Sequence, residues 1–436
     1  KVNDLYKLGM DSVRLNSEGA APIKEELANI AAMKRADLLS TIYHLHNDVT
    51  STLFGCFVMA DLKDSNVNIL YLGQASLGMG DRDYYLENDE NSTKIRNAYI
   101  NYIETMMKLA GYKPKAAKQA AKNVLKIETE IAKVTMTREE SRDMSRMYNI
   151  YTVDQLQKEF PSIKWAEYFV ARNLNGVDKA CVTEPKALAK VSELMATLKD
   201  QELKDYMAFD VITTASSYLS DDFVDANFEM FSHVMSGKTV QEPRWKRALG
   251  TPNNILGEAV GELYVEKYFP ASSKEKMLKL VNNLKVALGE HIASLDWMSD
   301  KTKVNALVKL NSFTVKIGYP DKWRDYSGIQ IDPEQSYWEN VRRARAFESA
   351  YALSKYGKPV DRDEWGMTPQ TVNAYYNPTT NEICFPAGIL QAPYFNPNGD
   401  DACNYGAIGV VIGHEMTHGF DDQGRNFDQN GNMVSW

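Results

Sequence analysis

Cysteine and histidine are scarce in this sequence. Its 436 residues include six histidines and four cysteines, which stand at Cys56, Cys181, Cys384 and Cys403. No two cysteines have CxxC spacing, and none stands near a histidine in a zinc-finger pattern. This scarcity excludes a disulfide scaffold. We favour buried free thiols, and the pattern leaves disulfide bonds open.

Long hydrophobic runs and an excess of basic residues are also missing. The longest apolar run near the C-terminus covers residues 407–412, far short of the ~20 residues that a membrane-spanning helix needs. Acidic residues outnumber basic ones by 58 to 50, so the formal net charge is −8. We therefore expect no membrane span in this chain and no nucleic acid as a partner.

The remaining composition is that of a globular protein, with 44% hydrophobic and 25% charged residues. Apolar residues with helical spacing dominate up to about residue 360, and Pro114 suits the first turn of a helix. The fold class we predict is mainly α with smaller β parts (α+β). Helices are expected over residues 114–131, 153–159, 188–198, 201–207, 222–236, 256–268, 273–298 and 335–356.

Two pairs of strands interrupt this pattern. Residues 52–59 and 67–71 have strand composition around a turn, which predicts an early β-hairpin. Residues 371–376 and 382–385 form a second such pair around an Asn-Pro turn. We predict a mainly helical domain over residues 1–360, parts of which can pack with the next domain. Residues 361–436 are expected to begin a mixed domain.

The motif His414-Glu415-Met416-Thr417-His418 is the one pattern that carries chemistry. On a helix, positions i and i+4 share a face, so the two imidazoles can bind one zinc ion. Glu415 can then accept a proton from a water that the metal activates. The alternative is a helix with two surface histidines and a solvated glutamate. The apolar residues before the motif disfavour it, because a core helix rarely carries this trio without a partner.

A catalytic zinc site needs a third protein ligand. In metzincins a third histidine and a glycine follow at fixed distances, where this sequence has Gly424 and Asp421, so that class is excluded. No Glu, His or Cys follows residue 418. The site is therefore incomplete unless an upstream residue folds in. Asp421 and Asp422 could orient a ligand histidine.

Several separate segments resemble the neprilysin / endothelin-converting-enzyme family of zinc metallopeptidases, in particular its bacterial endopeptidase O type. The similar segments span nearly the whole chain and are residues 78–85, 263–266, 316–320, 372–376, 385–391 and 409–424. The resemblance implies a helical domain and the first part of a thermolysin-like zincin (gluzincin) catalytic domain. It also implies a closed cavity that admits oligopeptides.

The resemblance also implies a role for individual residues. His414 and His418 would bind one Zn²⁺, and Glu415 would be the general base. Asn373 and Ala374 would bind the substrate backbone, on what we predict to be an edge strand. A hydrophobic pocket for the residue after the scissile bond would be lined by Ile389, Tyr394, Val410 and Val411. Ordinary core packing is the alternative for these four.

The sequence departs from the family in one respect. The family's E-N-x-A-D segment, which provides a glutamate as third ligand, and its later His and Arg residues are missing. We expect them downstream of Trp436, on a C-terminal fragment held as a second chain. The chain then looks like the N-terminal portion of a longer enzyme.

The sequence therefore predicts a zinc-dependent endopeptidase that hydrolyses oligopeptides and prefers a hydrophobic residue after the scissile bond. The alternative is a catalytically inactive peptide-binding protein with a peptidase fold. Export to a bacterial periplasm or cell surface is expected, with a cytoplasmic location left open. The basic cluster at residues 342–345 is expected to be the solvated face of a helix.

Overall fold

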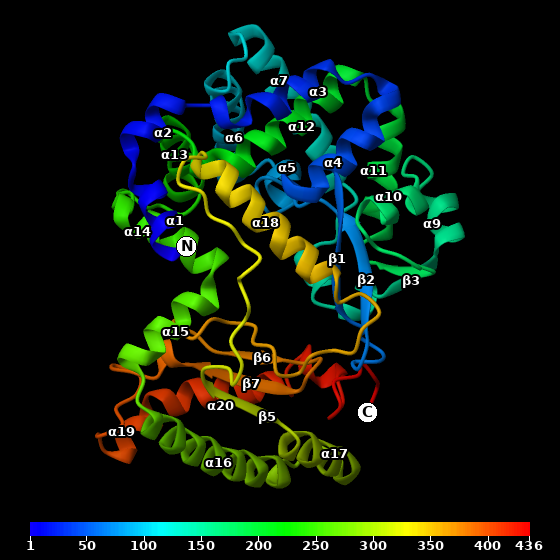
Figure 1. The fold of residues 1–436 in the computed structure, drawn as a ribbon. Helices are drawn as coiled ribbons and strands as arrows, with labels where there is room; N and C mark the ends of the chain where they lie inside the picture. The colour runs from blue at the N-terminus through cyan, green and yellow to red at the C-terminus, as the bar shows by residue number, and fades with distance from the viewer. The chain divides into compact units, whose positions relative to one another are not determined.

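The computed structural model describes residues 1–270 and 272–436 in full and residue 271 by its backbone. The described chain is mainly helical with two small sheets, which confirms the α+β class (Figure 1). It forms two compact units. Unit 1 consists of Lys1–Met59, Ile69–Ile255 and Ser327–Tyr356, and unit 2 of Ala60–Asn68, Leu256–Tyr326 and Gly357–Trp436.

We predicted a single domain boundary near residue 360, and the two units divide the chain differently. One passage between the units does lie there, between Tyr356 and Gly357, but unit 2 also contains two earlier stretches. Strand pairing is the reason: β5 (Thr314–Gly318) runs parallel to β7 (Glu382–Pro386) in one sheet. A change of composition along the chain cannot reveal such a pairing, because it depends on backbone hydrogen bonds between distant segments.

Unit 1 contains most of the helices. Its elements are α1 (Val2–Met10), α2 (Ser12–Glu18), η1 (Ala21–Ile23), α3 (Lys24–Ala32), η2 (Arg35–Asp37), α4 (Leu38–Asp48), β1 (Phe54–Ala60), β2 (Asn68–Gln74), α5 (Asp83–Leu86), α6 (Glu90–Leu109), α7 (Pro114–Ala132), α8 (Arg138–Ser141), η3 (Met144–Met147), β3 (Asn149–Thr152), α9 (Val153–Glu159), α10 (Trp165–Ala171), β4 (Lys179–Val182), α11 (Pro185–Thr197), α12 (Asp200–Ala215), η4 (Ser216–Tyr218), α13 (Asp221–Asn227), the π-helix η5 (Phe228–Val234), α14 (Arg244–Ile255) and α18 (Tyr337–Leu353). The hairpin β1–β2 has its turn in unit 2.

Unit 2 is smaller and combines helices with a three-stranded sheet. Its other elements are α15 (Gly257–Tyr268), α16 (Ala271–Ser294), α17 (Asp300–Asn311), β6 (Tyr375–Asn377), η6 (Ala387–Ile389), α19 (Asp401–Gly406), α20 (Ile408–His418) and η7 (Gly424–Asn426). The strand order is β5-β7-β6, with β6 antiparallel to β7. Among the described residues, β6 is therefore an edge strand.

The first sheet has the order β1-β2-β4-β3. Asp61 donates a backbone hydrogen bond to Val67 (2.8 Å), and Ala75 donates one to Leu53 (2.8 Å). These two bonds bracket β1 and β2 symmetrically, so the predicted early hairpin is confirmed. Strand β2 runs parallel to β4, and β3 runs antiparallel to β4.

Local sequence signals account for several helices of unit 1. Pro114 occupies the first turn of α7, as predicted, where its missing N–H costs nothing. A capping box formed by Thr152 and Gln155 begins α9. The helix predicted over residues 222–236 is correct in position, but its second half is the π-helix η5. Helix α18 begins after Ser336, whose hydroxyl accepts a hydrogen bond from the N–H of Glu339 (3.1 Å).

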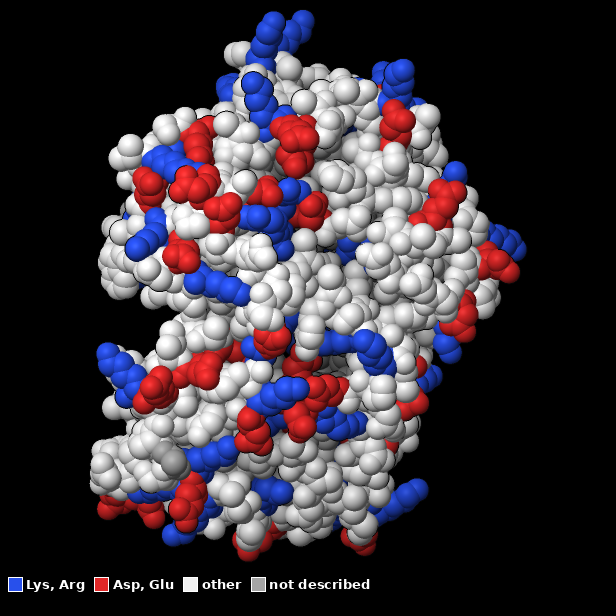
Figure 2. Space-filling view, in the orientation of Figure 1, with Lys and Arg blue, Asp and Glu red and all other residues white. Residues whose placement is uncertain are grey.

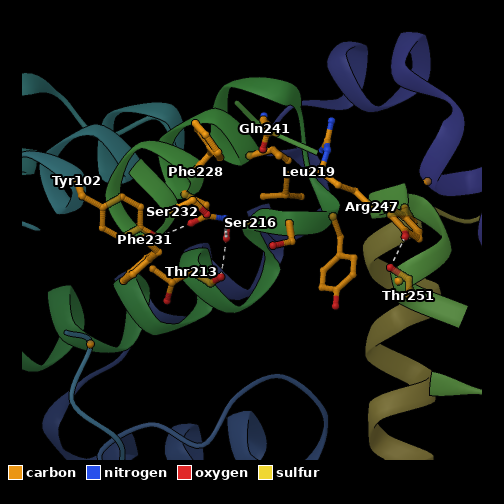
Figure 3. A pocket seen from close by; sticks show the side chains of 18 of the residues that line it. Tyr102, Thr213, Ser216, Leu219, Phe228, Phe231, Ser232, Gln241, Arg247 and Thr251 are labelled. Atoms are coloured by element: carbon orange, nitrogen blue, oxygen red, sulfur yellow. Dashed lines mark hydrogen bonds between the residues drawn. The ribbon is translucent and has the colours of Figure 1, made fainter. Parts of the chain in front are cut away.

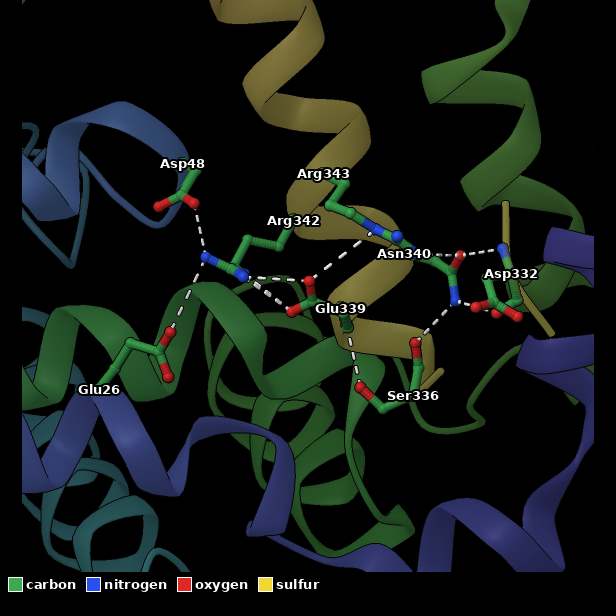
Figure 4. A network of polar contacts seen from close by, with 8 residues as sticks. All are labelled: Glu26, Asp48, Asp332, Ser336, Glu339, Asn340, Arg342 and Arg343. Carbon is green, nitrogen blue, oxygen red and sulfur yellow. Dashed lines mark hydrogen bonds and ion pairs between the residues drawn. The ribbon is translucent and has the colours of Figure 1, made fainter. Parts of the chain in front are cut away.

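The basic cluster on α18 is not a uniformly solvated face. The Arg342 side chain is only 19% exposed and lies between Asp48, at 2.5 Å, and Glu339, at 2.9 Å (Figure 4). Glu26 of α3 approaches the same guanidinium at 3.9 Å. Arg342 thus ties α18 to α3 and α4. The sequence prediction was wrong for this residue because its acidic partners are distant in sequence.

The surface carries charges of both signs. Lysine and arginine alternate with aspartate and glutamate over the face shown in Figure 2, in keeping with the net charge of −8. The four cysteines are free thiols, but only Cys181 and Cys384 are buried as favoured from the sequence, whereas Cys56 is half-buried and Cys403 is exposed. Within the described part of the chain, no helix has the length and apolar character needed to cross a bilayer.

A buried glutamate, Glu128 of α7, organises the loop that precedes α5. Its carboxyl group accepts hydrogen bonds from the hydroxyls of Tyr85 (2.7 Å) and Tyr99 (3.2 Å) and from the backbone N–H of Gly78 (3.2 Å). A side chain at position 78 would collide with the Tyr99 hydroxyl, so this close approach requires glycine. Burial raises the pKa of Glu128 to about 7, although the three hydrogen bonds oppose the rise.

We therefore expect Glu128 to make stability depend on pH. Its pKa rises from 4.5 to about 7 on folding, so the folded state holds a proton that the unfolded state releases. The free energy of unfolding should fall as pH rises through this window, by about 3 kcal/mol in total. Glu128→Gln should remove this contribution, as measured by denaturant unfolding between pH 4 and 8.

The matched control is Glu130→Gln, which changes a carboxylate on the same helix that is 33% exposed. Burial also raises the pKa of Asp210, to about 8. In both variants Asp210 should therefore still make the free energy of unfolding fall as pH rises. If the free energy of unfolding depends on pH in Glu128→Gln as it does in the wild type, Glu128 is not the source of this dependence.

Candidate active site

Helix α20 has one buried and one accessible face. Ile408, Ile412 and Met416, spaced four residues apart, are fully buried in the core of unit 2. Val410 and His414 are exposed and His418 is half-buried, and these three also follow at intervals of four residues. Residues at i, i+4 and i+8 lie along one face of a helix. The apolar stripe therefore fixes the rotation of α20 and presents both histidines on the accessible side.

The two imidazoles of the motif converge. Their Nε2 atoms lie 2.9 Å apart, and the ring centroids are separated by 4.5 Å in an edge-to-face arrangement. Each histidine thus directs the same nitrogen to a common point. Neutral imidazoles that meet in this way are a typical pair of zinc ligands.

Glu415 lies between the two histidines in sequence and is buried, with 5% of its surface exposed. Burial raises the pKa of its carboxyl group, and the neighbouring His414 and His418 partly oppose the rise. A buried carboxylate beside two imidazoles is suited to accept a proton within the site.

Asp421 orients His418. Its Oδ2 atom lies 2.8 Å from Nδ1 of His418, while its Oδ1 atom accepts hydrogen bonds from the N–H groups of Gln423 (3.0 Å) and Gly424 (2.7 Å). Burial alone would raise the pKa of Asp421, but these hydrogen bonds lower it below its ordinary value. The ionised carboxylate holds a proton on Nδ1 of His418 and so leaves Nε2 free to bind a metal. The orienting role considered for Asp421 from the sequence agrees with this geometry.

Lys309 of α17 binds the backbone of residues 419–427, the segment that follows α20. Its side chain is buried, and its Nζ atom donates hydrogen bonds to the carbonyls of Gly419 (2.6 Å), Gly424 (2.7 Å) and Phe427 (2.7 Å). Burial lowers the pKa of Lys309 to about 8, against the opposing effect of Asp428 and Asp421. At pH 7 the ammonium is mainly protonated, and its three N–H groups match the three carbonyls.

Sequence reasoning missed Lys309. One signal was available, because Ala306, Leu310 and Phe313 form the buried side of α17 and its C-terminal exit, and Lys309 falls on that side. A lysine at a core position of a helix is unusual unless it is paired. The partners, however, are backbone carbonyls more than a hundred residues away, which no sequence pattern identifies.

The predicted edge strand is shorter than expected. Strand β6 begins at Tyr375, so Asn373 and Ala374 precede the strand instead of lying on it. Asn373 is exposed and Ala374 is buried, and the Asn373 side-chain oxygen accepts a hydrogen bond from the N–H of Ala374 (2.9 Å). That local bond takes the place of a strand hydrogen bond, which explains the late start of β6. Strand β6 itself contacts α20.

The four residues expected to line a hydrophobic pocket have different environments. Ile389 is buried in the core of unit 2, and Val411 is half-buried against that core. Tyr394 and Val410 are 40% and 66% exposed. Val410 lies one helical turn before His414 on the accessible face, so it presents an apolar surface next to the histidine pair.

His414 and His418 are two candidate zinc ligands. Among the described residues, no group of three or more His, Cys, Asp or Glu side chains is arranged to hold a metal ion. Asp421 is occupied with Nδ1 of His418. The histidine pair fits zinc in donor type and in the convergence of its Nε2 atoms, but a complete catalytic site needs one more protein ligand.

Unit 1 contains large cavities of its own. One cavity of about 720 Å³ is lined by residues of α12, η4, η5 and α14 (Figure 3). Phe228, Phe231 and Ser232 of the π-helix form part of its wall, opposite Arg247 and Thr251 of α14. A second cavity, also of about 720 Å³, is lined by β1, β2, α12 and α18.

Comparison with known proteins identifies relatives over the whole chain. Two family models, both described as peptidase family M13, match residues 1–320 and residues 373–436. Endothelin-converting enzyme 1 of Homo sapiens is 37% identical over 461 residues, which cover 100% of this chain and 59% of the relative. The enzyme of the same name from Bos taurus is 34% identical over 462 residues, covering 100% of this chain and 60% of the relative.

Solved structures have the same fold. The Mycobacterium tuberculosis zinc metalloprotease ZMP1 in complex with an inhibitor has a TM-score of 0.92 and 38% identity, and covers 99% of this chain and 66% of that protein. PEPO from Lactobacillus rhamnosis HN001 has a TM-score of 0.91 over 100% of this chain and 69% of that protein, and its 24% identity supports the fold alone. The chain spans about 60% of the length of the endothelin-converting enzymes that it matches.

We expect Lys309→Met to destabilise unit 2 by about 3 kcal/mol or more, because buried carbonyls left without a donor cost about 1–3 kcal/mol each. The measurement is denaturant or thermal unfolding followed by tryptophan fluorescence. Lys301→Met is the control, since it removes an exposed lysine from the same helix and should change stability by less than about 0.5 kcal/mol. Equal stability of the two variants would show that the three hydrogen bonds contribute little.

Proposed function

The chain belongs to peptidase family M13, and from this premise we propose that it is the N-terminal part of a zinc-dependent endopeptidase that hydrolyses oligopeptides. The finer part of the proposal is a preference for a hydrophobic residue after the scissile bond. The observation that carries the proposal is the convergence of the His414 and His418 Nε2 atoms, 2.9 Å apart, with the buried Glu415 between them in the motif.

Each residue of the site would have a separate role in peptide hydrolysis. His414 and His418 would hold zinc through Nε2. When bound, zinc supplies a Lewis acid for the scissile carbonyl and makes a water molecule more acidic. The carboxylate of Glu415 would accept the proton of the attacking water and pass it to the leaving amine. Asp421 would keep the proton of His418 on Nδ1, and Lys309 would hold the backbone after α20 in place.

Substrate binding would use the edge of the second sheet. A peptide in extended form can add to the free edge of β6 as a further strand. Asn373 and Ala374 lie immediately before this edge, which supports their proposed role in binding the substrate backbone. A peptide that bonds to the N–H of Ala374 would have to replace its present bond to the Asn373 side chain. Val410, exposed on the face of α20 that carries His414, supports the preference for a hydrophobic residue.

A catalytically inactive peptide-binding protein is the competing function. It would need the same edge strand but would have no need for a buried glutamate beside two converging imidazoles. Burying a carboxyl group costs free energy, so the retention of Glu415 at 5% exposure favours catalysis.

We further propose that the third zinc ligand comes from a part of the enzyme outside residues 1–436. Two facts support this: the described residues supply no third ligand, and the chain covers about 60% of its relatives. The missing part would belong to a C-terminal fragment that associates with this chain as a second chain.

Glu415→Gln tests the catalytic role in the complete enzyme. We expect peptide hydrolysis to fall by several orders of magnitude, because an amide cannot accept the proton. Zinc content should remain equal to that of the wild type, as measured by atomic absorption. Turnover close to the wild-type rate would refute the assignment, whereas loss of zinc would show that Glu415 acts through the metal site and not as a base.

Zinc affinity tests the third ligand. We expect residues 1–436 alone to bind zinc at least about a hundredfold more weakly than the complete enzyme, because a missing protein ligand should cost more than the 10–100-fold loss of an outer-shell partner. Competition with a fluorescent chelator gives the two affinities. Tight, stoichiometric zinc and full peptidase activity in residues 1–436 would show that a residue of this chain completes the site.

A further inference from the structure

Strand β1 of unit 1 has a free edge. It is an outer strand in the order β1-β2-β4-β3, and within the described part of the chain it pairs with β2 alone. The two backbone bonds that bracket the hairpin place Phe57 opposite Tyr71. The rings of these two residues are stacked, with centroids 5.2 Å apart, in agreement with this register.

The register decides which backbone groups of β1 remain without a strand partner. In an antiparallel pair, each residue directs its N–H and C=O to the same side, and successive residues alternate between the two sides. The bracketing bonds engage the odd-numbered residues just before and just after β1. The odd-numbered residues of the strand therefore bond to β2, and Cys56 and Val58 direct their N–H and C=O groups to the free edge.

This edge lacks the features that usually protect an outer strand. Natural edge strands are short, or carry charged residues or proline, because an unpaired edge attracts another strand. Strand β1 has seven residues without a charge or a proline, and its Phe57 and Met59 side chains are 46% and 37% exposed. The other outer strands are shorter or charged: β3 has four residues, β6 has three, and β5 contains Lys316. Strand β1 is therefore suited to receive a partner.

A cavity adjoins the free edge. Gly55, Cys56 and Phe57 line the second cavity of unit 1, whose volume is about 720 Å³. In the register of the hairpin, Gly55 lies opposite Gly73, which lines the same cavity. Neither strand fills this space with a side chain. A glycine inside a strand often marks a place where a ligand or another backbone approaches closely.

We propose that the edge of β1 binds an extended apolar peptide segment as an additional strand. A polypeptide backbone offers N–H and C=O groups at the two-residue repeat of Cys56 and Val58, which is the basis of recognition by strand addition. The side chain of the peptide residue beside Gly55 would extend into the cavity. A second copy of the folded chain is less suited, because its strand would have to enter that cavity.

The inferred site goes beyond the proposed function. All the residues that form it belong to unit 1, and it does not require the same peptide to contact the histidine pair. Binding at β1 can therefore be measured without catalysis.

Hydrogen exchange at single residues, measured by mass spectrometry with electron-transfer fragmentation, tests the proposal. The protein is the complete enzyme with Glu415→Gln, so that the probe is not cleaved. The probe is a peptide of alternating threonine and valine residues, as long as β1, between two terminal lysines. The control peptide has the same sequence with an N-methyl group on every residue between the lysines. Because the readout is local, binding of the probe elsewhere does not contribute.

We expect the probe, at about 1 mM, to slow exchange at Cys56 and Val58 by at least about tenfold, because their N–H groups gain acceptors. Phe57 and Met59, already bonded to β2, should change less. The N-methylated peptide has no N–H groups for the ladder and should leave all four amides unchanged.

A matched pair of variants in the same background tests the outward N–H of Val58. Val58→Pro removes this donor and keeps the bonds to β2, whereas Val58→Ala shortens the side chain and keeps the donor. The probe concentration that half-protects Cys56 should rise about tenfold or more in Val58→Pro, and it should stay within about threefold in Val58→Ala. Unchanged exchange at Phe57 and Met59 without the probe shows that β1 is intact in each variant. If Val58→Pro does not fold, the comparison of the two peptides decides.

Four results overturn the proposal. They are unchanged exchange at Cys56 and Val58 with the probe, equal protection by the N-methylated peptide, an unchanged half-protecting concentration in a folded Val58→Pro, and a dimer by light scattering in which both amides are protected without the probe. The last result would identify a second copy as the occupant. Failure of the proposed function is a separate result, in which the complete wild-type enzyme hydrolyses no peptide, and the exchange data do not depend on it.

Discussion

The ammonium group of Lys309 donates hydrogen bonds to three backbone carbonyls at and after the end of α20, where helical hydrogen bonding stops. Its Nζ atom lies within 2.7 Å of the carbonyl oxygens of Gly419, Gly424 and Phe427 and donates a hydrogen bond to each. These contacts set the path of the chain that bears Asp421, and Asp421 in turn holds the ring of His418. The orientation of His418, a proposed zinc ligand, thus depends on a buried cation that does not contact the imidazole itself. A few hydrogen bonds to a charge in a low-dielectric core are strong enough for this task.

Paired charges hold distant segments together in both units. In unit 2 the buried Lys309 donates to three backbone carbonyls, which favours a rigid site. In unit 1 the Arg342 guanidinium lies between Asp48 and Glu339 and so joins α18 to α4. In each case the cation joins segments that lie far apart in the sequence.

Sequence reasoning was most reliable where the signal is local. The helical period predicted α7 and α9, and the turn composition predicted the hairpin β1–β2, because a helix or hairpin is determined mainly by neighbours in the chain. It was less reliable at the ends of elements. The π-helix η5 and the late start of β6 depend on competing local hydrogen bonds, such as that between Asn373 and Ala374. Arg342 was assigned to the surface because its partners, Asp48 and Glu26, are some 300 residues away.

The sequence by itself determined the family and the H-E-x-x-H motif. The spacing of His414 and His418 places both on one face of any helix, whatever surrounds it. Only the tertiary structure decided that this face is accessible. Ile408, Ile412 and Met416 pack into the core of unit 2, and this packing leaves the histidine face on the outside. It also decided that Lys309 holds the backbone after α20 and that Arg342 lies between Asp48 and Glu339. Burial and long-range pairing are properties of the packed chain, and they cannot be read from the order of the residues because distant segments meet only on folding.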